Sequence, residues 1–504
     1  MNQYDVIINA QDQSYAKVVA DFNIIQEMYD YFSFHVEGYQ FNPKYKYGGW
    51  DGKIRLMGLN GDLPFGLIEQ VQKFTDSMQY KLYISPDVLP EPVMTRPQFD
   101  EWLNNKTIYS GDKIITPHWF QSDAVFEGLN HRRRILNLPT SAGKSLIQAL
   151  LSKWYCENKS DKILIVVPTT ALVYQMINDF ADYRLFNHSD CHGILAGTAK
   201  DSNARIYVST WQSAVKQPKS WFSQFGMLLT DECHLATGKS IGDIIKKLDQ
   251  CSWKIGLSGS LRDGKANLLQ YIGLFGKVFK HVSTKQLMDD GQISDLKINA
   301  MFLEYTPEER KSVKELTYQQ EIDWLLTHKK RNQLIIKLAL KLSKERGETT
   351  VIMFKSIKHG KLLYEALKKL HDKVHYVSGE TDTDERVALK EIAEADSGLI
   401  IVASYGVFST GISIKRLHNV IYGHPTKSKI TVLQSIGRIL RLHGTKNIAT
   451  LYDLIDNLSI SNTRKNAKKE YSHVNFTMKH GILRIERYIQ EQFNYQIAKL
   501  QMGG

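Results

Sequence analysis

The segment Leu138–Ser145 has the residue types and spacing of a loop that binds phosphate. It follows a short apolar run and opens a helical pattern, so its backbone N–H groups would converge on an anion at the positive end of a helix. Lys144 would reach the β- and γ-phosphates of a nucleotide, and the Ser145 hydroxyl would ligate Mg²⁺. The residues expected around ATP are Pro139, Thr140, Ser141, Ala142, Gly143, Lys144 and Ser145. The alternative is an ordinary helix start that contains glycine.

Two adjacent carboxylates, Asp231 and Glu232, end a second apolar run. One acid of such a pair can hold Mg²⁺ while the other orients or deprotonates the attacking water, so we assign Asp231 to the metal and Glu232 to the water. A helix N-cap with surface charge is the alternative, and the position after a strand counts against it. His234, two residues on, is interpreted as a coupling residue.

A third pattern is helical and contains Gln434, Arg438 and Arg441, in which the two arginines are three residues apart and would share one face. Arginine suits the charge that develops on a phosphoryl group during transfer, so these residues are predicted to reach ATP from the opposite wall of a cleft. A solvated basic helix face is the alternative. Gln121, upstream of the phosphate loop, is predicted to pair its amide with the adenine edge.

Parallel α/β sheets are the elements that must position these side chains. Short β-branched runs alternate with longer helical patterns from about residue 115 to 260, and again from 350 to 452. The expected strands are Ile135–Leu138, Ile163–Val167, Arg205–Val208, Met227–Leu229 and Lys254–Leu257, then Thr350–Phe354, Val374–Val377, Leu399–Val402, Asn419–Tyr422 and Ala449–Tyr452. Since ligands lie at the carboxyl ends of parallel strands, where these motifs fall, the sequence predicts an α/β fold with two tandem doubly wound sheets.

The two ends of the chain follow other patterns. Residues 1–95 contain aromatic and β-branched segments with Asp51-Gly52 and Asn60-Gly61, dipeptides favoured in tight turns, so we expect a small α+β domain. The C-terminal segment is expected to be basic and helical, with one apolar stripe. The stripe residues are Ile482, Ile485, Ile489 and Phe493. The predicted domains are therefore residues 1–95, 96–284, 285–458 and 459–504.

Composition narrows the class of protein. The net charge of the 504 residues is +12, and residues 1–95 are acidic, so the middle and the tail carry the basic charge and favour a polyanion as partner. The longest apolar runs are much shorter than the ~20 residues that cross a bilayer, and the first ten residues do not form a secretory signal. We therefore expect a soluble, unsecreted protein that needs no membrane. The four cysteines form no CxxC pair, which fits a reducing compartment.

Taken together and in this order, the motifs resemble those of helicase superfamily two. Besides Gln121, the phosphate loop and Asp231–His234, the matching segments are Val167–Gln175, Val208–Thr210, Leu257–Ser260, Met353–Ser356, Val377–Gly379, Ala403–Ile412 and Gln434–Arg441. The resemblance covers residues 110–455 and implies two RecA-like domains, ATP and Mg²⁺ as cofactors, and ATP hydrolysis that depends on nucleic acid.

The resemblance also implies roles for individual residues. Members of the superfamily hold one nucleic-acid strand by its phosphates in a groove across both domains, and the matching residues here are Thr169, Thr210, Lys355, Ser378 and Ser404. The residues that match coupling motifs are His234, Ser258, Ser260 and Gly411. Capping of the following helices is the alternative for the short hydroxyls. Ser413 stands where many relatives carry an acid, which leaves the coupling details open.

Within the superfamily, the whole chain resembles the recombination helicases of T-even bacteriophages. That resemblance implies an ATP-dependent DNA helicase that unwinds and remodels branched DNA, including junctions, stalled forks and R-loops, in the cytoplasm of a host cell. Its implied partners are branched, single-stranded and duplex DNA and RNA–DNA hybrids. An RNA helicase would share the same ATP motifs. A nucleic-acid binding or annealing module with a vestigial ATP site is the alternative outside enzymes, and the intact Lys144, Glu232 and Arg441 disfavour it.

Residues 415–433 are too few for a sheet strand and a long strand-separating hairpin, so a wedge must lie elsewhere. The candidate is Phe41–Arg55, where basic and aromatic residues alternate, and the predicted contacts are Lys44, Lys46 and Trp50. Rings that stack on bases and cations that hold phosphates suit a surface that grips a junction. The alternative is a hairpin whose aromatic rings form its own small core. The basic residues Arg464, Lys465, Lys468 and Lys469 are a second candidate for duplex contact.

Overall fold

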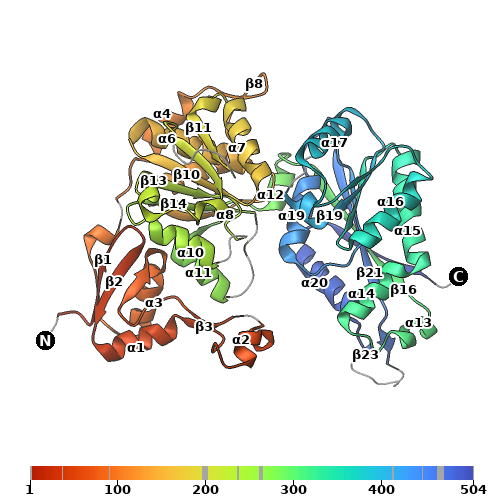
Figure 1. Ribbon diagram of the computed structural model, residues 1–504, viewed down its shortest axis with the longest axis horizontal. Helices are drawn as coiled ribbons and strands as arrows, with labels where there is room; N and C mark the ends of the chain where they lie inside the picture. The colour runs from red at the N-terminus through yellow and green to blue at the C-terminus, as the bar shows by residue number, and fades with distance from the viewer. Residues whose placement is uncertain are drawn as a thin grey trace. The chain divides into compact units, whose positions relative to one another are not determined.

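The computed structural model describes residues 3–36, 38–89, 91–195, 202–234, 238–259, 261, 265–410, 414–444, 446–462 and 470–502 (Figure 1). The chain forms two compact units, Met1–Leu138 with Ala142–His281 and Pro139–Ser141 with Val282–Gly504. Each unit contains one seven-stranded sheet whose paired strands are all parallel. The predicted pair of doubly wound sheets is therefore confirmed.

The first sheet has the strand order β11-β12-β10-β13-β14-β9-β15. Its strands are β9 (Arg133–Asn137), β10 (Lys162–Val167), β11 (Cys191–Ile194), β12 (Ile206–Thr210), β13 (Phe225–Thr230), β14 (Trp253–Ser258) and β15 (Val278–Phe279). The helices around it are α4 (Arg96–Asn104), α5 (Trp119–His131), α6 (Lys144–Asn158), α7 (Thr170–Asp182), α8 (Trp211–Ala214), α9 (Lys219–Phe222), α10 (Gly238–Lys247) and α11 (Lys265–Phe275). Strands β10 and β12–β14 are almost wholly buried, as a parallel sheet covered on both faces requires. All five predicted strands are present, and β11 and β15 extend the sheet.

The second sheet has the order β18-β19-β17-β20-β21-β16-β24. Its strands are β16 (Asp295–Glu304), β17 (Thr350–Phe354), β18 (Val374–Val377), β19 (Ile400–Ser404), β20 (Asn419–Tyr422), β21 (Ile448–Asn457) and β24 (Tyr495–Gln501). Helices α15 (Lys329–Leu340) and α16 (Ile357–Lys368) lie on one face, and α19 (Lys429–Ile439) and α20 (Phe476–Gln490) lie on the other (Figure 1). The remaining helices of this unit are α12 (Thr284–Asp289), α13 (Pro307–Ser312), α14 (Tyr318–Thr327), α17 (Thr383–Ala395) and α18 (Tyr405–Thr410). The five predicted strands are confirmed, and β16 and β24 are additional.

The C-terminal segment contributes both a helix and the edge strand β24, so it is less purely helical than expected. The predicted apolar stripe is wrong for Ile482 and Ile489, which are 40% and 56% exposed, whereas Ile485 packs against a buried cluster and Phe493, beyond α20, is buried. Helix α20 instead buries Arg484 and Tyr488. The guanidinium of Arg484 donates to both carboxylate oxygens of Asp453 on β21 at 2.8–3.0 Å, and the Tyr488 hydroxyl donates to Asp453 Oδ2 at 2.8 Å. A buried ion pair therefore orients this helix.

The N-terminal residues form the expected small α+β domain around a four-stranded sheet of order β5-β2-β1-β6. Its elements are β1 (Val6–Ala10), β2 (Tyr15–Ala20), α1 (Phe22–Tyr31), β5 (Asp62–Pro64), α3 (Ile68–Met78) and β6 (Leu82–Ile84). The turn at Gly61 needs glycine, because its φ is +86° and an added Cβ would lie 2.2 Å from the Val18 carbonyl oxygen. A separate antiparallel pair, β3 (Ser33–His35) and β4 (Lys53–Arg55), carries a loop with the short helix α2 (Pro43–Lys46).

This small domain is docked on the first sheet through backbone groups. The carbonyl oxygen of Gln13 accepts hydrogen bonds from the guanidinium of Arg133 at 2.6 Å and from Lys254 Nζ at 2.5 Å. At Gly66, an added Cβ would lie 1.6 Å from the carbonyl oxygen of Ile272 on α11. Burial lowers the pKa of Lys254 to about 7. Two buried cations and a backbone contact thus join the small domain to the first sheet as one body.

Candidate nucleotide and nucleic-acid site

The strand order of the first sheet divides its carboxyl edge into two halves. Thr210 ends β12 and lies in register with Val167, the end of β10, which Thr169 follows. Asp231 follows β13, the next strand along, and Ser258 ends β14 beside β9, which the phosphate loop follows. The residues predicted to touch nucleic acid therefore occupy one half of the edge, and those predicted to touch ATP occupy the other.

The phosphate loop begins helix α6 at Gly143, as predicted. Gly143 is the N-cap of the helix with a φ of +74°, and an added Cβ there would lie 2.3 Å from Gln121 Nε2. The Gln121 side chain is buried: its Nε2 donates to the Ala142 carbonyl at 2.9 Å, and its Oε1 accepts from the His118 backbone N–H at 2.9 Å. Gln121 therefore supports the loop in this structure. These bonds use one of the two amide N–H donors and one of the two lone pairs of Oε1, and the contact with adenine stays a prediction.

Lys144 and Glu232 face one another across the predicted ATP site, with 3.6 Å between Lys144 Nζ and Glu232 Oε1. The backbone of Glu232 has a φ of +45°, which is unfavourable for a residue with a Cβ and persists only where surrounding contacts enforce it. Those contacts come from neighbouring strands: Asp231 N donates to the Val166 carbonyl at 2.8 Å, and Cys233 N donates to the Leu257 carbonyl at 3.0 Å. The sheet thus holds this turn in a strained conformation, as is common at functional sites.

Asp231 has the properties of a cation ligand. Burial, together with the neighbouring Glu232, raises the pKa of the Asp231 carboxyl, and Lys144 partly opposes this effect. Its Oδ1 is buried and has no hydrogen-bond partner among the residues that the structure describes. An unsatisfied buried carboxylate oxygen is costly unless a cation approaches it, so Asp231 fits Mg²⁺.

Ser145, the second predicted metal ligand, is the first side chain after Lys144 on α6. Its Oγ lies 2.8 Å from the Tyr183 phenolic oxygen. Tyr183 caps the carboxyl end of α7 and was not predicted from the sequence. No motif marks it, and only the fold brings it to Ser145.

The structure brings two predicted coupling residues together. His234 is fully buried, and its Nδ1 lies 2.6 Å from Ser258 Oγ and 3.3 Å from Glu232 Oε2. The Tyr271 hydroxyl donates to the His234 carbonyl at 3.1 Å. The Glu232 carboxylate is therefore connected to Ser258 on β14 through the imidazole of His234. Ser260 and Gly411, the other two coupling predictions, lie outside the described residues.

The hydroxyls predicted to hold nucleic acid also cap helices. Thr169 Oγ1 accepts from Leu172 N at the start of α7, and Thr210 Oγ1 accepts from Ser213 N at the start of α8. The capping role is thus confirmed, and it leaves one further lone pair on each oxygen for another donor. Both residues end or follow adjacent strands, so their hydroxyls share one edge.

The second sheet places its three predicted nucleic-acid residues on neighbouring strands. Lys355 follows β17 and is exposed, while Ser404 ends β19 and is half-buried. Ser378 follows β18, is 2% exposed, and its Oγ accepts from Glu380 N at 3.3 Å. Lys355 and Ser404 remain accessible to a phosphate, whereas the Ser378 hydroxyl stabilises its own turn.

Gln434, Arg438 and Arg441 lie on and just after helix α19. Gln434 is buried and Arg438 is half-buried. The helix ends at Ile439 with Leu440 as its C-cap, so Arg441 lies beyond the helix. The expectation that both arginines share a helical face is therefore wrong, because the chain leaves the helix one residue after Ile439.

The loop between β3 and β4 is open to solvent. Phe41 and Tyr47 are 80% and 88% exposed, and Lys44 and Lys46 are also exposed. Trp50 is half-buried and donates its Nε1–H to the Lys53 carbonyl at 2.9 Å. The alternative of a self-packed aromatic core therefore fails for Phe41 and Tyr47, whereas Trp50 is held within the loop by its hydrogen bond. The basic residues of 463–469 lie outside the described residues.

Across the described ranges, no helix is long and apolar enough to cross a membrane.

Three family models match the chain. They are DNA helicase UvsW, N-terminal, over residues 5–85, Type III restriction enzyme, res subunit, over residues 102–263, and Helicase conserved C-terminal domain over residues 330–443. The chain is 54% identical over 502 residues to the ATP-dependent DNA helicase uvsW of Enterobacteria phage T4, and the match covers 99% of this chain and 100% of that protein. It is 27% identical to the DNA 3'-5' translocase XPB2 of Sulfurisphaera tokodaii, over 64% of this chain and 78% of that one. The crystal structure of T4 UvsW matches with a TM-score of 0.54 and 52% identity, over 99% of this chain and 100% of that structure.

Proposed function

This chain belongs to the UvsW family of ATP-dependent DNA helicases in helicase superfamily two, and on that premise we propose that it remodels branched DNA. The proposed reactions are migration of junctions, regression of stalled forks and unwinding of R-loops during recombination, repair and replication. Its kinship with a phage protein supports action in the cytoplasm of an infected cell.

ATP hydrolysis uses one half of the first sheet's edge. Lys144 neutralises the phosphates, and Glu232, held close to Lys144, accepts the proton of the attacking water. Asp231 and Ser145 would hold Mg²⁺, which supplies positive charge to the phosphates when it is bound. We assign the completion of the site to Gln434, Arg438 and Arg441, because arginine stabilises the charge of the transferring phosphoryl group.

DNA binding uses the other half of the edge and the matching strands of the second sheet. Thr169, Thr210, Lys355 and Ser404 present hydroxyls and one ammonium, groups that contact phosphates without selecting bases. Translocation then follows when ATP binding and hydrolysis alternately change the grip of the two sheets on the strand. His234 provides a route between Glu232 and Ser258 for part of that coupling.

The observation that carries the branched-DNA proposal is the exposed loop between β3 and β4. Lys44, Lys46 and the ring of Tyr47 lie open to solvent on a domain that is fixed to the first sheet. Exposed cations beside exposed rings suit contact with phosphates and with unpaired bases at a branch point. The loop therefore acts as a second grip, separate from the strand held by the sheets.

The decisive experiment measures ATP hydrolysis with single-stranded DNA, duplex DNA, a four-way junction, RNA and an RNA–DNA hybrid at equal nucleotide concentrations. We expect the junction to stimulate hydrolysis at the lowest concentration. It should also be resolved into duplex products in the presence of ATP. Stimulation by RNA alone would instead establish an RNA helicase, and equal half-saturation with linear duplex and junction would refute branch recognition.

A further inference from the structure

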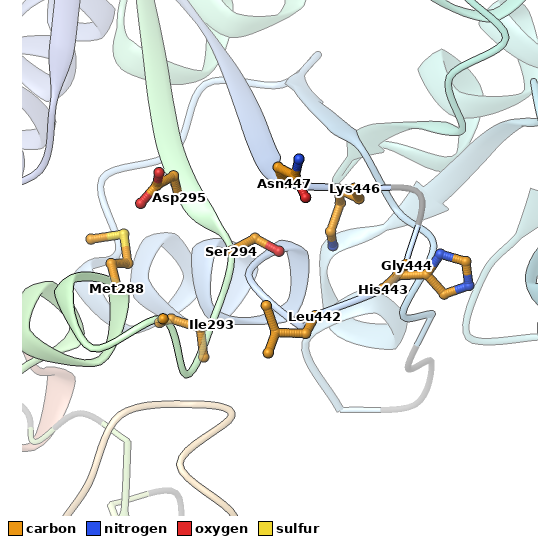
Figure 2. Close-up of a pocket in the computed structure, with 10 residues that line it drawn as sticks. Met288, Ile293, Ser294, Asp295, Leu442, His443, Gly444, Lys446 and Asn447 are labelled. Atoms are coloured by element: carbon orange, nitrogen blue, oxygen red, sulfur yellow. The ribbon is translucent and has the colours of Figure 1, made fainter.

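Two buried polar side chains hold the carboxyl end of helix α19 (Figure 2). The last carbonyls of a helix have no partners within the helix and must find donors elsewhere. Ser294 N donates to the Leu440 carbonyl at 2.8 Å, and Ser294 Oγ donates to the Arg441 carbonyl at 3.3 Å. Lys446 Nζ donates to the Ile439 carbonyl at 2.7 Å. Three successive carbonyls, the last of which belongs to Arg441, are therefore bound by two residues: Lys446 through its side chain, and Ser294 through its backbone N–H and its hydroxyl.

Lys446 also binds a second segment of the chain. Its ammonium donates to the carbonyls of Lys415 and Leu417, each at 3.0 Å. An ammonium has three N–H donors, and these three bonds use all of them. Lys415 and Leu417 come shortly after the segment Ala403–Ile412, which matches a nucleic-acid and coupling motif. One cation thus joins the backbone after that segment to the backbone that precedes Arg441.

The burial of this charge needs an explanation. Lys446 is 3% exposed, and burial lowers the pKa of its ammonium to about 8, with Arg441 acting in the same direction and Glu394 opposing it. A buried charge costs free energy, and an apolar side chain of similar volume often stabilises a fold better. A gain in stability is therefore a poor explanation for a lysine here. A requirement for a fixed backbone geometry is a better one.

Packing does not provide that geometry by itself. A pocket of about 510 Å³ lies beside Ser294 and Lys446, which line it together with Met288, Asp295, Leu442 and His443, among others (Figure 2). The chain after Arg441 borders this pocket, and Leu442 is 51% exposed. On this side, which side chains do not fill, the hydrogen bonds from Ser294 and Lys446 restrain the backbone at Arg441.

We propose that Lys446, assisted by Ser294, is a positioning residue that sets Arg441 for ATP hydrolysis and links it to the DNA-responsive segment before Lys415. This inference rests on the proposed role of Arg441 at the ATP site. Lys446 acts through the backbone, so its loss lowers turnover and leaves ATP binding largely intact. Its effect depends on the presence of the Arg441 side chain.

The test is a double-mutant cycle with Lys446→Met and Arg441→Ala. We expect Lys446→Met to lower DNA-stimulated kcat by about tenfold, with KM for ATP within about twofold, and to cause no further loss when Arg441→Ala is already present. Lys446→Arg should recover part of the rate because it restores a buried donor. Lys373→Met, at an exposed lysine of the same unit that pairs with Asp396, is the matched control and should leave kcat unchanged.

The outcomes distinguish a failure of the positioning role of Lys446 from a failure of the proposed role of Arg441. A full additional loss in the double variant shows that Lys446 acts independently of Arg441, and the inference is then wrong. Normal turnover in Arg441→Ala alone removes the proposed function of that residue instead. If Lys446→Met does not fold, Ser294→Ala takes its place in the cycle, since it removes one hydroxyl. We then expect a smaller decrease in kcat that again disappears in the Arg441→Ala background, and additivity there overturns the proposal.

Discussion

The Ser145 hydroxyl lies 2.8 Å from the phenolic oxygen of Tyr183, and this contact joins the two halves of the first sheet's edge. Tyr183 caps the carboxyl end of α7, whose amino end is capped by Thr169. One helix therefore runs from a predicted DNA contact to a predicted metal ligand.

Tyr183→Phe tests the value of this contact, because it removes only the oxygen. A serine that offers its lone pairs to Mg²⁺ must direct its own proton elsewhere, and the Tyr183 phenolic oxygen lies within hydrogen-bonding distance as an acceptor. We expect the Mg²⁺ concentration for half-maximal ATP hydrolysis to rise about two- to tenfold, the range for one hydrogen bond. Tyr174→Phe, at a 54% exposed tyrosine of the same helix, is the control. An unchanged or lower Mg²⁺ requirement would contradict the assignment.

Lys144→Ala tests the ATP half of the edge. Removing the ammonium leaves the phosphates without their main cation, so we expect ATP turnover to fall by at least about a hundredfold while DNA binding stays within about twofold. Lys153→Ala on the same helix, where the lysine is 30% exposed, controls for the loss of a charge on α6. Turnover and filter-binding assays suffice, and normal turnover in Lys144→Ala would refute the site.

Lys44→Ala/Lys46→Ala tests the loop between β3 and β4. We expect the dissociation constant for a forked duplex to rise about fivefold or more at moderate salt, with a much smaller change for single-stranded DNA, because the loop is predicted to touch the branch. Lys73→Ala/Lys81→Ala removes the same charge elsewhere on the domain. If both double variants weaken fork binding equally, net charge is the cause and the loop has no special role.

Asp453→Asn tests the buried ion pair of α20. Arg484 would keep its charge in a site that is 2% exposed and would lose its counter-charge, so we expect the free energy of unfolding to fall by about 3–5 kcal/mol. Chemical denaturation followed by circular dichroism measures the loss. Glu486→Gln, at an exposed position of the same helix, should change stability little. A loss in Asp453→Asn as small as in this control would mean that the pair is solvated.

Acid should destabilise the second unit through His359 and His424. Burial lowers the pKa of His359 to about 3 and that of His424 to about 4, from an ordinary value of 6.5. Between pH 6.5 and these values only the unfolded chain takes up the protons, so stability present above pH 6.5 is lost as the pH falls, by about 1.4 kcal/mol per unit of pKa shift and residue. Denaturation midpoints at about pH 7.5 and pH 5 measure this loss. His359→Gln should flatten the dependence, and His188→Gln, at an exposed histidine, should not; equal slopes in both would contradict the prediction.

The interior strands could be predicted from the sequence because each is a short β-branched run between helical patterns. Strand β16 lacks a continuous apolar run along its first half, where exposed and buried residues alternate; that alternation is itself typical of a half-buried strand, so β16 was predictable. Strand β24 was not, because nearly all of it is exposed. Strand β24 joins the sheet through backbone bonds to β16, which side-chain hydropathy does not report. The stripe predicted for α20 failed for a related reason, since a helical pattern of isoleucines cannot reveal that Arg484 is buried against Asp453.

The residues of the candidate site also fall into two groups, those that the sequence could predict and those that it could not. Lys144, Asp231 and Glu232 could be proposed as site residues from the sequence because they are close to strand ends. Tyr183, Ser294 and Lys446 could not, because each acts on a partner that only the folded chain brings near. The half-burial of Trp50 and the exposure of Tyr47 also depend on the path of one loop, which a basic and aromatic composition leaves undecided.

The contact at Gly66 limits how this protein can be rebuilt. Because an added Cβ would lie 1.6 Å from the Ile272 carbonyl, the small domain meets α11 with no side chain between them. The domain is therefore not an exchangeable cassette: a chimaera that grafts it onto another motor must also transplant α11 and the two cations at Gln13. In a directed-evolution library, position 66 should tolerate only glycine.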